Sequence, residues 1–329
     1  MTDVGRVVSA TPVRAQYIRH ESTTLRLAVL VALAAAVVLV AALASLIVPY
    51  DPYAQDLSMA LRAPGPGHLL GTDRYGRDLL SRIIMGGQSS IFSTFALVVL
   101  ASVVGTSVGV ACGWRGGVLD TVLMRASDVF LAFPGLVFAL AVAGVLGGGM
   151  QNAVIALAAI SWPKYARIAR GLTLAQKDAT YLAAARLSAC TDAQLIFRHI
   201  LHNIVGPILV TAMLDIGTMM MELAGLSFLG LGAQPPLAEW GSMMSGNRNL
   251  LQTAPWTILA PGVAIFVTVM IFNLLGDTIR DWIDPAHRTT RRGGRGRLGP
   301  LCGVRTHGGA GISADSPDAD ASGVRSQVK

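Results

Sequence analysis

Two carboxylates stand in an otherwise apolar stretch, residues 204–229. Asp215 and Glu222 are seven residues apart, so on a helix they lie two turns apart on nearly one face. A carboxylate at membrane depth is costly unless it faces protein or water. The pair therefore marks an inward helix face, and two interpretations remain open. Either the carboxylates line a translocation path and attract an ammonium group or a metal complex, or they hydrogen-bond to neighbouring helices.

Other residue types that could do chemistry are not arranged for it. The methionines at 219–221 are consecutive, so they point in different directions around a helix, which favours packing over a thioether site. Cys112, Cys190 and Cys302 are far apart and lack metal-ligand spacing. The sequence contains no G-x-x-x-x-G-K-[ST] loop for a nucleotide. We expect no catalytic residue, no metal and no cofactor in this chain.

Long apolar runs must position these residues. Charged residues make up 14% of the sequence, against about 25% in soluble domains, which indicates a lipid environment. Backbone groups in hydrocarbon must bond within helices or a closed barrel, and continuous apolar runs select helices. The sequence predicts an all-α integral membrane protein with six transmembrane helices. They are expected at 27–48, within 83–114, twice within 129–163, at 204–229 and at 258–275.

Two of these predicted helices need comment. Residues 129–163 are divided by glycines at 147–149, which predict a tight hairpin between the third and fourth helices. The fourth has a short apolar part, so the aliphatic portions of the Lys164 and Arg167 side chains must complete its apolar length. The run 27–48 could also be a cleavable signal peptide, but it exceeds the usual apolar length of about 7 to 15 residues. We therefore interpret it as the first transmembrane helix.

Basic residues give this arrangement a direction. With the amino terminus in the cytoplasm, 21 of the 26 lysines and arginines fall in inside segments and five in outside segments. This asymmetry is the one expected for cytoplasmic loops. A net charge of +7 could also suggest nucleic acid, but the basic residues are not clustered on a soluble domain with interleaved aromatics. We expect both termini inside, membrane lipid as a partner and no nucleic acid.

Residues 164–203 form a long predicted cytoplasmic loop. It is too polar for lipid but rich in helix formers, so one or two short helices are expected. The segment 181–186 places small residues between larger ones, which lets a helix approach a partner groove closely. An amphipathic helix that lies on the bilayer surface is equally compatible with the composition.

Four stretches of sequence, in a fixed order, resemble one family. They are LGTD at 70–73 with GRD at 76–78, the cytoplasmic segment 181–203, LSFLGLG at 226–232 with PP at 235–236 and EWG at 239–241, and NLLGD at 273–277 with RD at 280–281 and DP at 284–285. Over residues 69–288, about two thirds of the chain, the sequence resembles permease subunits of binding-protein-dependent ABC importers. The likeness is to the C-type inner-membrane subunits for dipeptides, oligopeptides and nickel.

The resemblance implies a type I ABC importer permease fold in the cytoplasmic membrane. The expected organisation is a cytoplasmic tail at 1–26, the first helix at 27–48, an external loop at 49–87, an ABC transmembrane type-1 domain at 88–283 and a disordered cytoplasmic tail at 284–329. The implied partners are a second homologous permease, one or two ABC ATPase subunits that use the ATP, and an extracytoplasmic solute-binding protein. Dipeptides or oligopeptides are the first expected solutes, and a nickel chelate is the alternative.

In this family the cytoplasmic segment carries a Glu-Ala-Ala motif, then a glycine, then a hydrophobic residue with Leu-Pro, and its helix seats in a cleft of the ATPase. The positions that the resemblance assigns to ATPase coupling are Tyr181, Leu182, Ala183, Ala184, Ala185, Arg186, Ala189, Arg198 and His199. This chain departs from the pattern where Ala183 replaces the glutamate, Ala189 the glycine and His202 the proline. The first change removes a charge, and the second restricts a left-handed turn.

The external segment 73–82 has charges at helical spacing. Asp73 with Arg77, Arg74 with Asp78, and Asp78 with Arg82 are each four residues apart. This spacing predicts a helical entry with ion pairs on its surface. We expect a structural role, because exposed pairs stabilise only weakly.

The loop 230–255 contains Pro235, Pro236 and Trp240. The prolines predict a rigid turn, and the tryptophan predicts an aromatic at the membrane interface. The loop could face the solute-binding protein, or it could be a re-entrant plug packed on its own bundle. The sequence does not separate these alternatives.

Two other protein classes fit the sequence less well. A secondary transporter predicts internal repeats and interrupted helices, and no convincing repeat is present. An intramembrane enzyme would need further reactive groups beside Asp215 or Glu222, and no histidine lies in a predicted span.

Overall fold

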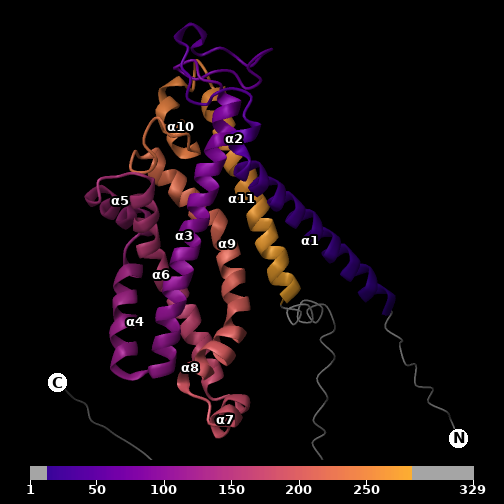
Figure 1. Ribbon diagram of the computed structural model, residues 1–329, viewed down its shortest axis with the longest axis vertical. Coiled ribbons are helices and arrows are strands. Elements are labelled where there is room, and N and C mark those ends of the chain that lie inside the picture. The colour runs from indigo at the N-terminus through magenta and orange to yellow at the C-terminus, as the bar shows by residue number, and fades with distance from the viewer. Residues whose placement is uncertain (1–12, 284–329) are drawn as a thin grey trace, which may run out of the picture. The chain divides into compact units, whose positions relative to one another are not determined.

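The computed structural model describes residues 13–283, with the side chains of residues 24–282. The chain divides into two units, Met1–Pro285 and Ala286–Lys329; the second unit, with most of the predicted tail 284–329, and residues 1–12 lie outside the described residues. Within 13–283 the structure is built from helices and has two isolated bridges but no strand (Figure 1). The predicted all-α class is confirmed.

Four long helices of the described part are apolar enough to cross a membrane. They are α1 (Val13–Ala42), α3 (Leu79–Arg115), α9 (Leu201–Phe228) and α11 (Trp256–Ile283). The pair α4 (Gly117–Ala132) and α5 (Gly135–Val145), bent by 97°, is a fifth span if the two helices are counted as one. Helix α6 (Met150–Lys177), which contains the predicted fourth transmembrane helix, is not among these apolar helices, because its C-terminal half carries basic residues.

Successive crossings alternate in direction (Figure 1). We call the end that holds residues 48–78 and α10 (Trp240–Asn247) the outer end. The opposite end, which we call the inner end, holds α7 (Thr180–Leu187), α8 (Asp192–Gln194) and a π-helical turn η2 (Leu195–Ile200). The remaining short elements are α2 (Ala44–Ile47), η1 (Leu57–Met59) and η3 (Arg248–Leu250).

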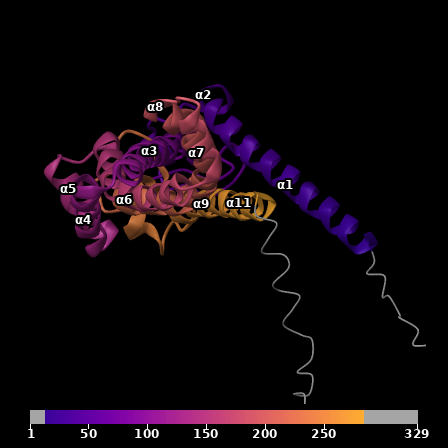
Figure 2. The same cartoon turned by 90° about the horizontal axis from the view of Figure 1, so that it is seen from below.

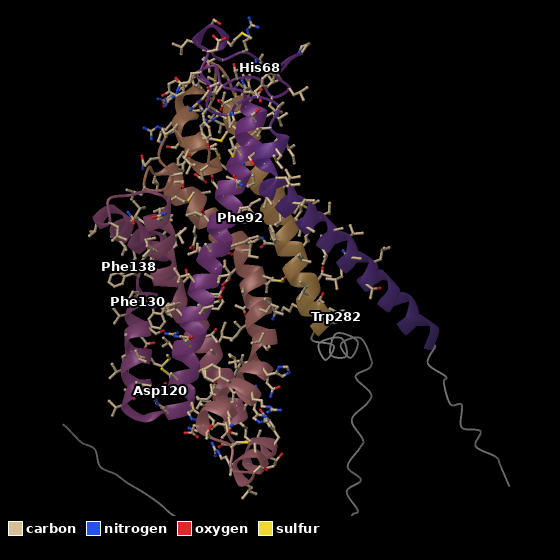
Figure 3. The ribbon with its side chains drawn as sticks, viewed as in Figure 1. His68, Phe92, Asp120, Phe130, Phe138 and Trp282 are labelled. Carbon is tan, nitrogen blue, oxygen red and sulfur yellow. The ribbon has the colours of Figure 1, made fainter. Side chains whose placement is uncertain are left out.

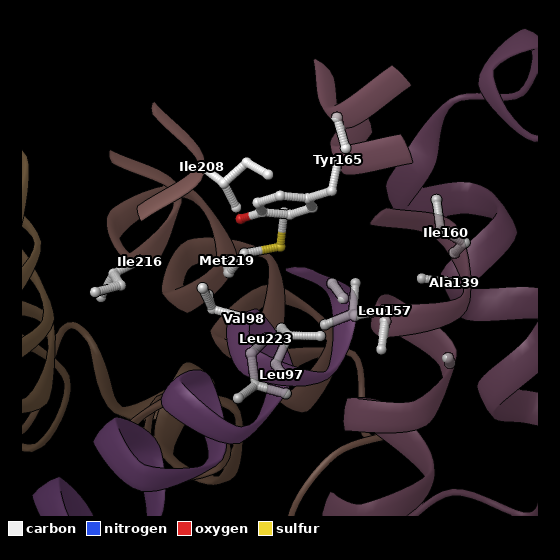
Figure 4. Packing of buried hydrophobic residues seen from close by; sticks show 14 of the residues in the cluster. Leu97, Val98, Ala139, Leu157, Ile160, Tyr165, Ile208, Ile216, Met219 and Leu223 are labelled. Carbon is white, nitrogen blue, oxygen red and sulfur yellow. The ribbon is translucent and has the colours of Figure 1, made fainter. Parts of the chain in front are cut away.

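The closest helix pair is α3 with α6. Gly105, Gly109 and Gly113 recur every four residues on the α3 face that meets α6, and a Cβ at Gly113 would lie 2.8 Å from Cβ of Thr173. Small residues at this spacing allow two membrane helices to pack backbone to backbone. A core of apolar side chains, with Leu97, Leu157 and Met219 among them, joins α9 to this pair (Figure 4).

The third span is bent at Pro134. Phe133 precedes a proline and takes an extended conformation with ψ 145°, because the α conformation before proline is sterically disfavoured. Across the bend, the rings of Phe130 and Phe138 are 5.6 Å apart, and Phe130 also meets Trp162 of α6 (Figure 3). The pair α4 and α5 thereby packs on one side of α6, and α11 lies on the other side of the bundle (Figure 2).

Several predicted boundaries need correction. The first apolar run is not one helix over 27–48, because α1 begins at or before Val13 and a break at Leu43 separates it from α2. The outer loop ends at Asp78, which caps α3, so α3 begins eight residues before the end of the predicted loop 49–87. Residues 117–128 are helical in α4, although charges there favoured a loop. Helix α6 continues to Lys177, which shortens the predicted loop 164–203.

Candidate translocation surface and coupling segment

Asp73 and Asp78, the acids of the predicted helical entry 73–82, are buried. Asp73 receives two bonds from Arg77, Nε at 2.7 Å and Nη2 at 2.7 Å, and Arg82 Nε lies 3.7 Å away. The predicted Asp73–Arg77 pair is therefore present, but in a loop that precedes the helix. Arg82 also donates to the Pro52 carbonyl at 3.0 Å. These bonds fix residues 48–78 onto the outer end of α3.

The other two predicted pairs are wrong because Asp78 is the N-cap of α3. Its carboxylate accepts from the Ser81 backbone at 2.8 Å and from His68 Nδ1 at 2.8 Å. A capping carboxylate satisfies free N–H groups of the first turn. Arg74 instead stacks on the Tyr75 ring, 4.7 Å from its centroid. His68 and Asp120 lie at opposite ends of the bundle (Figure 3).

Helix α10 is a plug packed on its own bundle. Trp240 is buried, so the predicted interfacial position is wrong; its Nε1 donates to the Ile83 carbonyl of α3 at 2.9 Å, and its ring covers Gly86 and Gly87. Glu239 caps α10 by accepting from the Gly241 backbone at 2.9 Å. Of the two alternatives for loop 230–255, the packed plug describes this helix.

Glu239 is fully buried in this plug. Besides its capping bonds, it accepts from Ser90 of α3 at 3.2 Å. Burial raises the pKa of the Glu239 carboxyl above its ordinary value, although bonds from the backbone of Gly241 and Ser242 oppose the shift. The plug and α3 thus share a buried acid.

The two carboxylates of α9 have different surroundings. Asp215 is buried and forms an ion pair with Lys164 of α6; the side chains are 5% and 47% exposed. Asp215 Oδ2 has no hydrogen-bond partner in the described part of the chain. Glu222 is half-buried and has no ion pair or hydrogen bond among the described residues. Interhelical pairing therefore accounts for Asp215 and does not account for Glu222.

Further ion pairs follow towards the inner end of α6. Arg167 meets Asp128 of α4 at 2.5 Å, and Arg170 binds both oxygens of Asp120 at 2.5 and 2.7 Å. Between α4 and α6, Met124, Asp128, Arg167 and Arg170 line a cavity of about 340 Å³. The sequence interpretation missed the two acids because it placed them in a loop; their spacing of eight residues, with helical neighbours, was the available signal.

Two of the three methionines beside Glu222 serve packing. Met219 lies in the core shared with α3 and α6, and Met220 packs in a second cluster with Trp240. Met221 is exposed. The predicted divergence of the three side chains is confirmed.

The inner end presents residues 178–200, which we call the coupling segment. Leu182 is fully buried and Tyr181 is bonded on both sides: its hydroxyl donates to Gln176 at 2.8 Å and accepts from Asn203 at 3.0 Å. Arg186 lies over the Trp114 ring at 5.2 Å, and Lys177 donates to the Trp114 carbonyl at 2.6 Å. Helix α7 is thereby tied to the inner ends of α3, α6 and α9.

The exposed side of the coupling segment includes two large apolar residues. Leu187 is 90% exposed and Phe197 71% exposed, and Ala183, Ala184 and Arg198 are exposed as well. Neither Leu187 nor Phe197 was among the positions predicted for coupling; their apolar character within a polar loop was the signal. Ala189 adopts φ +59°, the left-handed conformation that the expected glycine would take without strain.

These features define a class: a helical membrane protein with an outer plug, ion pairs between its helices and an anchored segment at its inner end. Residues 105–289 match the family of the binding-protein-dependent transport system inner membrane component, and the chain belongs to this family. The chain is 42% identical to the glutathione transport system permease protein of Pectobacterium atrosepticum over 243 residues, covering 74% of this chain and 81% of the relative.

Other relatives carry different solute names. The dipeptide transport system permease protein of Haemophilus influenzae is 40% identical over 76% of this chain and 86% of its own length. The nickel transport system permease protein of Escherichia coli K12 is 40% identical over 72% and 86%. The fold is similar to a chain in an inward-facing structure of the MetNI methionine ABC transporter, with a TM-score of 0.52 and 17% identity over 63% of this chain and 98% of that chain.

The chain is therefore a multi-pass membrane permease subunit of an ABC importer.

Proposed function

We propose that this subunit imports dipeptides or oligopeptides and that separate ATPase chains drive it. The observation that carries the proposal is the anchored coupling segment. Because Trp114 and Tyr181 tie α7 to α3, α6 and α9, a force applied to the exposed face of α7 reaches the helices that hold Asp215 and Glu222. The chain has no phosphate-binding loop, so ATP binds to the partner.

The coupling role is assigned to the exposed part of the segment. Ala183, Ala184, Arg198 and the protruding Leu187 and Phe197 would contact the ATPase. The other predicted positions keep their proposed part in coupling: Tyr181, Leu182 and Arg186 would hold the segment against the bundle, and the set is completed by Ala185, Ala189 and His199. Aromatic and aliphatic anchors of this kind contribute most of the affinity of many interfaces.

The remaining partners follow from membership of the family. A second homologous permease would complete the path, one or two ATPases would dock inside, and an extracytoplasmic solute-binding protein would deliver the solute to the outer end. Both termini would lie in the cytoplasm, in agreement with the distribution of basic residues. Asp215 and Glu222 would line the path.

Peptides are proposed as solutes because relatives at 40% identity or more are named for dipeptide and glutathione transport, and glutathione is a tripeptide. A nickel chelate is the second candidate, since a relative of similar identity is named for nickel. Labelled dialanine and labelled nickel, offered to cells with and without this chain, distinguish the two. Loss of dialanine uptake alone supports the proposal, and loss of nickel uptake alone contradicts it.

The proposal that ATP binds to partner chains and not to this subunit is tested with purified protein. The isolated chain should bind no ATP analogue, and proteoliposomes should accumulate dialanine when the second permease, the ATPases, the solute-binding protein and ATP are all present. ATP binding by the isolated chain would contradict the assignment, as would uptake driven by an ion gradient without ATPases.

A further inference from the structure

Glu222 has a special position among the charges of the helices. Apart from Arg82 in the first turn of α3, Glu222 is the one charged side chain in the outer halves of the described long helices. These halves are residues 28–42, 83–97, 135–145, 150–163, 216–228 and 256–269. Glu222 is half-buried and unpaired among the described residues. An ionised, unpaired carboxylate at this depth must face water or a ligand, because lipid would not solvate it.

The next charge inward is the Lys164–Asp215 pair. Asp215 is 13 residues from the outer end of α9, and Lys164 is 14 residues from the outer end of α6, so both lie about 20 Å inward. Lys164, which carries the ammonium, is the exposed partner of the pair, whereas Asp215 is buried. Lysine has three N–H donors, which leaves donors for an acceptor on the exposed side.

Glu222 and Asp215, the partner of Lys164, lie on one face of α9. Asp215, Thr218 and Glu222 are spaced by three and four residues along α9, so they share a helix face. Lys164 is ion-paired with Asp215, which places its ammonium beside this face of α9. The exposed Thr218 between Asp215 and Glu222 keeps the face polar.

We infer that Glu222 and Lys164 form a two-pole station for a zwitterionic peptide, with the solute ammonium at Glu222 and its carboxylate at Lys164. Glu222 and Asp215, which holds Lys164, are seven residues apart on α9, so the two charges are separated by about 10 Å along the helix axis. An extended dipeptide spans about 7 Å and a tripeptide about 10 Å, and a hydrogen bond adds about 3 Å at each end, so peptides of two or three residues reach both poles. This inference rests on the proposed peptide import and names the charge and length of its solute.

The test uses the complete transporter in proteoliposomes and three probes: dialanine, N-acetyl-dialanine, which lacks the ammonium, and dialanine amide, which lacks the carboxylate. Uptake is normalised to the occupancy of the solute-binding protein. The unmodified transporter should prefer dialanine over each blocked probe by at least about tenfold, the worth of a charged hydrogen bond.

Each pole has its own variant. Glu222→Gln should remove discrimination against the N-acetyl probe, and Glu222→Asp should retain part of it. The double variant Lys164→Gln with Asp215→Asn, which keeps a neutral pair, should remove discrimination against the amide. Met221→Gln, a polar change at the exposed neighbour, should leave both preferences as they are.

The outcomes separate the two levels of the argument. If the unmodified transporter imports none of the three probes, the proposed peptide import is wrong. If it imports dialanine and the variants keep the original preferences, the station is wrong. Loss of discrimination in the Glu222 variant alone would also overturn the two-pole arrangement, because a cation site needs no role for Lys164.

Discussion

At the scale of single residues, Ala189 has a strained backbone conformation, as the replacement of the expected glycine predicted. Glycine is the expected residue there, and alanine takes φ +59°. A left-handed conformation costs an L-residue about 1 kcal/mol. Replacement Ala189→Gly should therefore stabilise the coupling segment, although glycine loses part of this gain through the freedom of the unfolded chain.

We predict that Ala189→Gly raises the protection of backbone amides in residues 178–200 against hydrogen exchange by up to about fivefold. Ala184→Gly, at an exposed helical position of α7, is the matched control and should lower protection, because glycine weakens a helix. Equal effects of both changes would mean that Ala189 carries no left-handed strain.

Glu239 predicts a dependence of stability on pH. Its pKa is raised by burial, so the folded protein binds this proton more tightly than the unfolded chain does. The stabilisation is present below the ordinary value of 4.5 and is lost as the pH rises through the raised value. The Tm of the purified chain should fall over this interval, and the fall should be smaller in Glu239→Gln. Equal pH profiles would contradict the buried proton.

The carboxylates show how far residue patterns reach. The spacing of Asp215 and Glu222 predicted a shared inward face, but a pairing partner 51 residues away cannot be found from spacing along one helix. The same limit applies to Asp78. Its distance from Arg82 predicted an ion pair, whereas capping of α3 and contact with His68 took precedence, because a helix start offers unsatisfied N–H groups.

At the scale of elements, apolar runs located the long helices because hydrocarbon demands length and continuity. The helix α4 was missed because Asp120 and Asp128 made it appear solvent-exposed. Their charges are compensated by Arg170 and Arg167 of α6, and this compensation depends on tertiary contact. Pro134, at the bend of the third span, was a legible signal that the sequence interpretation did not use.

The glycine contact between α3 and α6 gives a prediction at this scale. Gly109→Leu should destabilise the bundle by about 3 kcal/mol or more, since added methylenes in a packed interior force the helices apart. Thermal unfolding in detergent measures the effect. Gly171→Leu is the control, because a Cβ at Gly171 meets nothing within 4 Å. Equal losses of stability would show that α3 and α6 do not depend on small residues for their approach.

The coupling segment gives a second prediction. Phe197→Ala and Leu187→Ala should each weaken binding of the ATPase to the permease by about tenfold or more, with the fold retained, because both side chains protrude from the bundle. Co-purification of the ATPase over a range of concentrations measures the change. The exposed outer residue Leu69 provides the control Leu69→Ala, and a similar loss there would contradict a specific role of the segment.

At the scale of the whole molecule, the described helices, which carry ion pairs, connect residues 48–78 and α10 at the outer end to the coupling segment at the inner end. Family membership and the alternating direction of the long helices agree with the multi-pass arrangement predicted from the apolar runs. The sequence could not reveal the partners' contacts, because those depend on surfaces of other chains. The account requires above all that residues 178–200 lie inside the cell.

Cysteine labelling tests this requirement most directly. With Cys112, Cys190 and Cys302 replaced by alanine, Ala183→Cys probes the coupling segment and Ala63→Cys probes the outer loop; both positions are exposed. A membrane-impermeant maleimide should label the Ala63→Cys variant in intact cells. It should label the Ala183→Cys variant only after the cells are permeabilised. Labelling of the Ala183→Cys variant in intact cells would contradict the account.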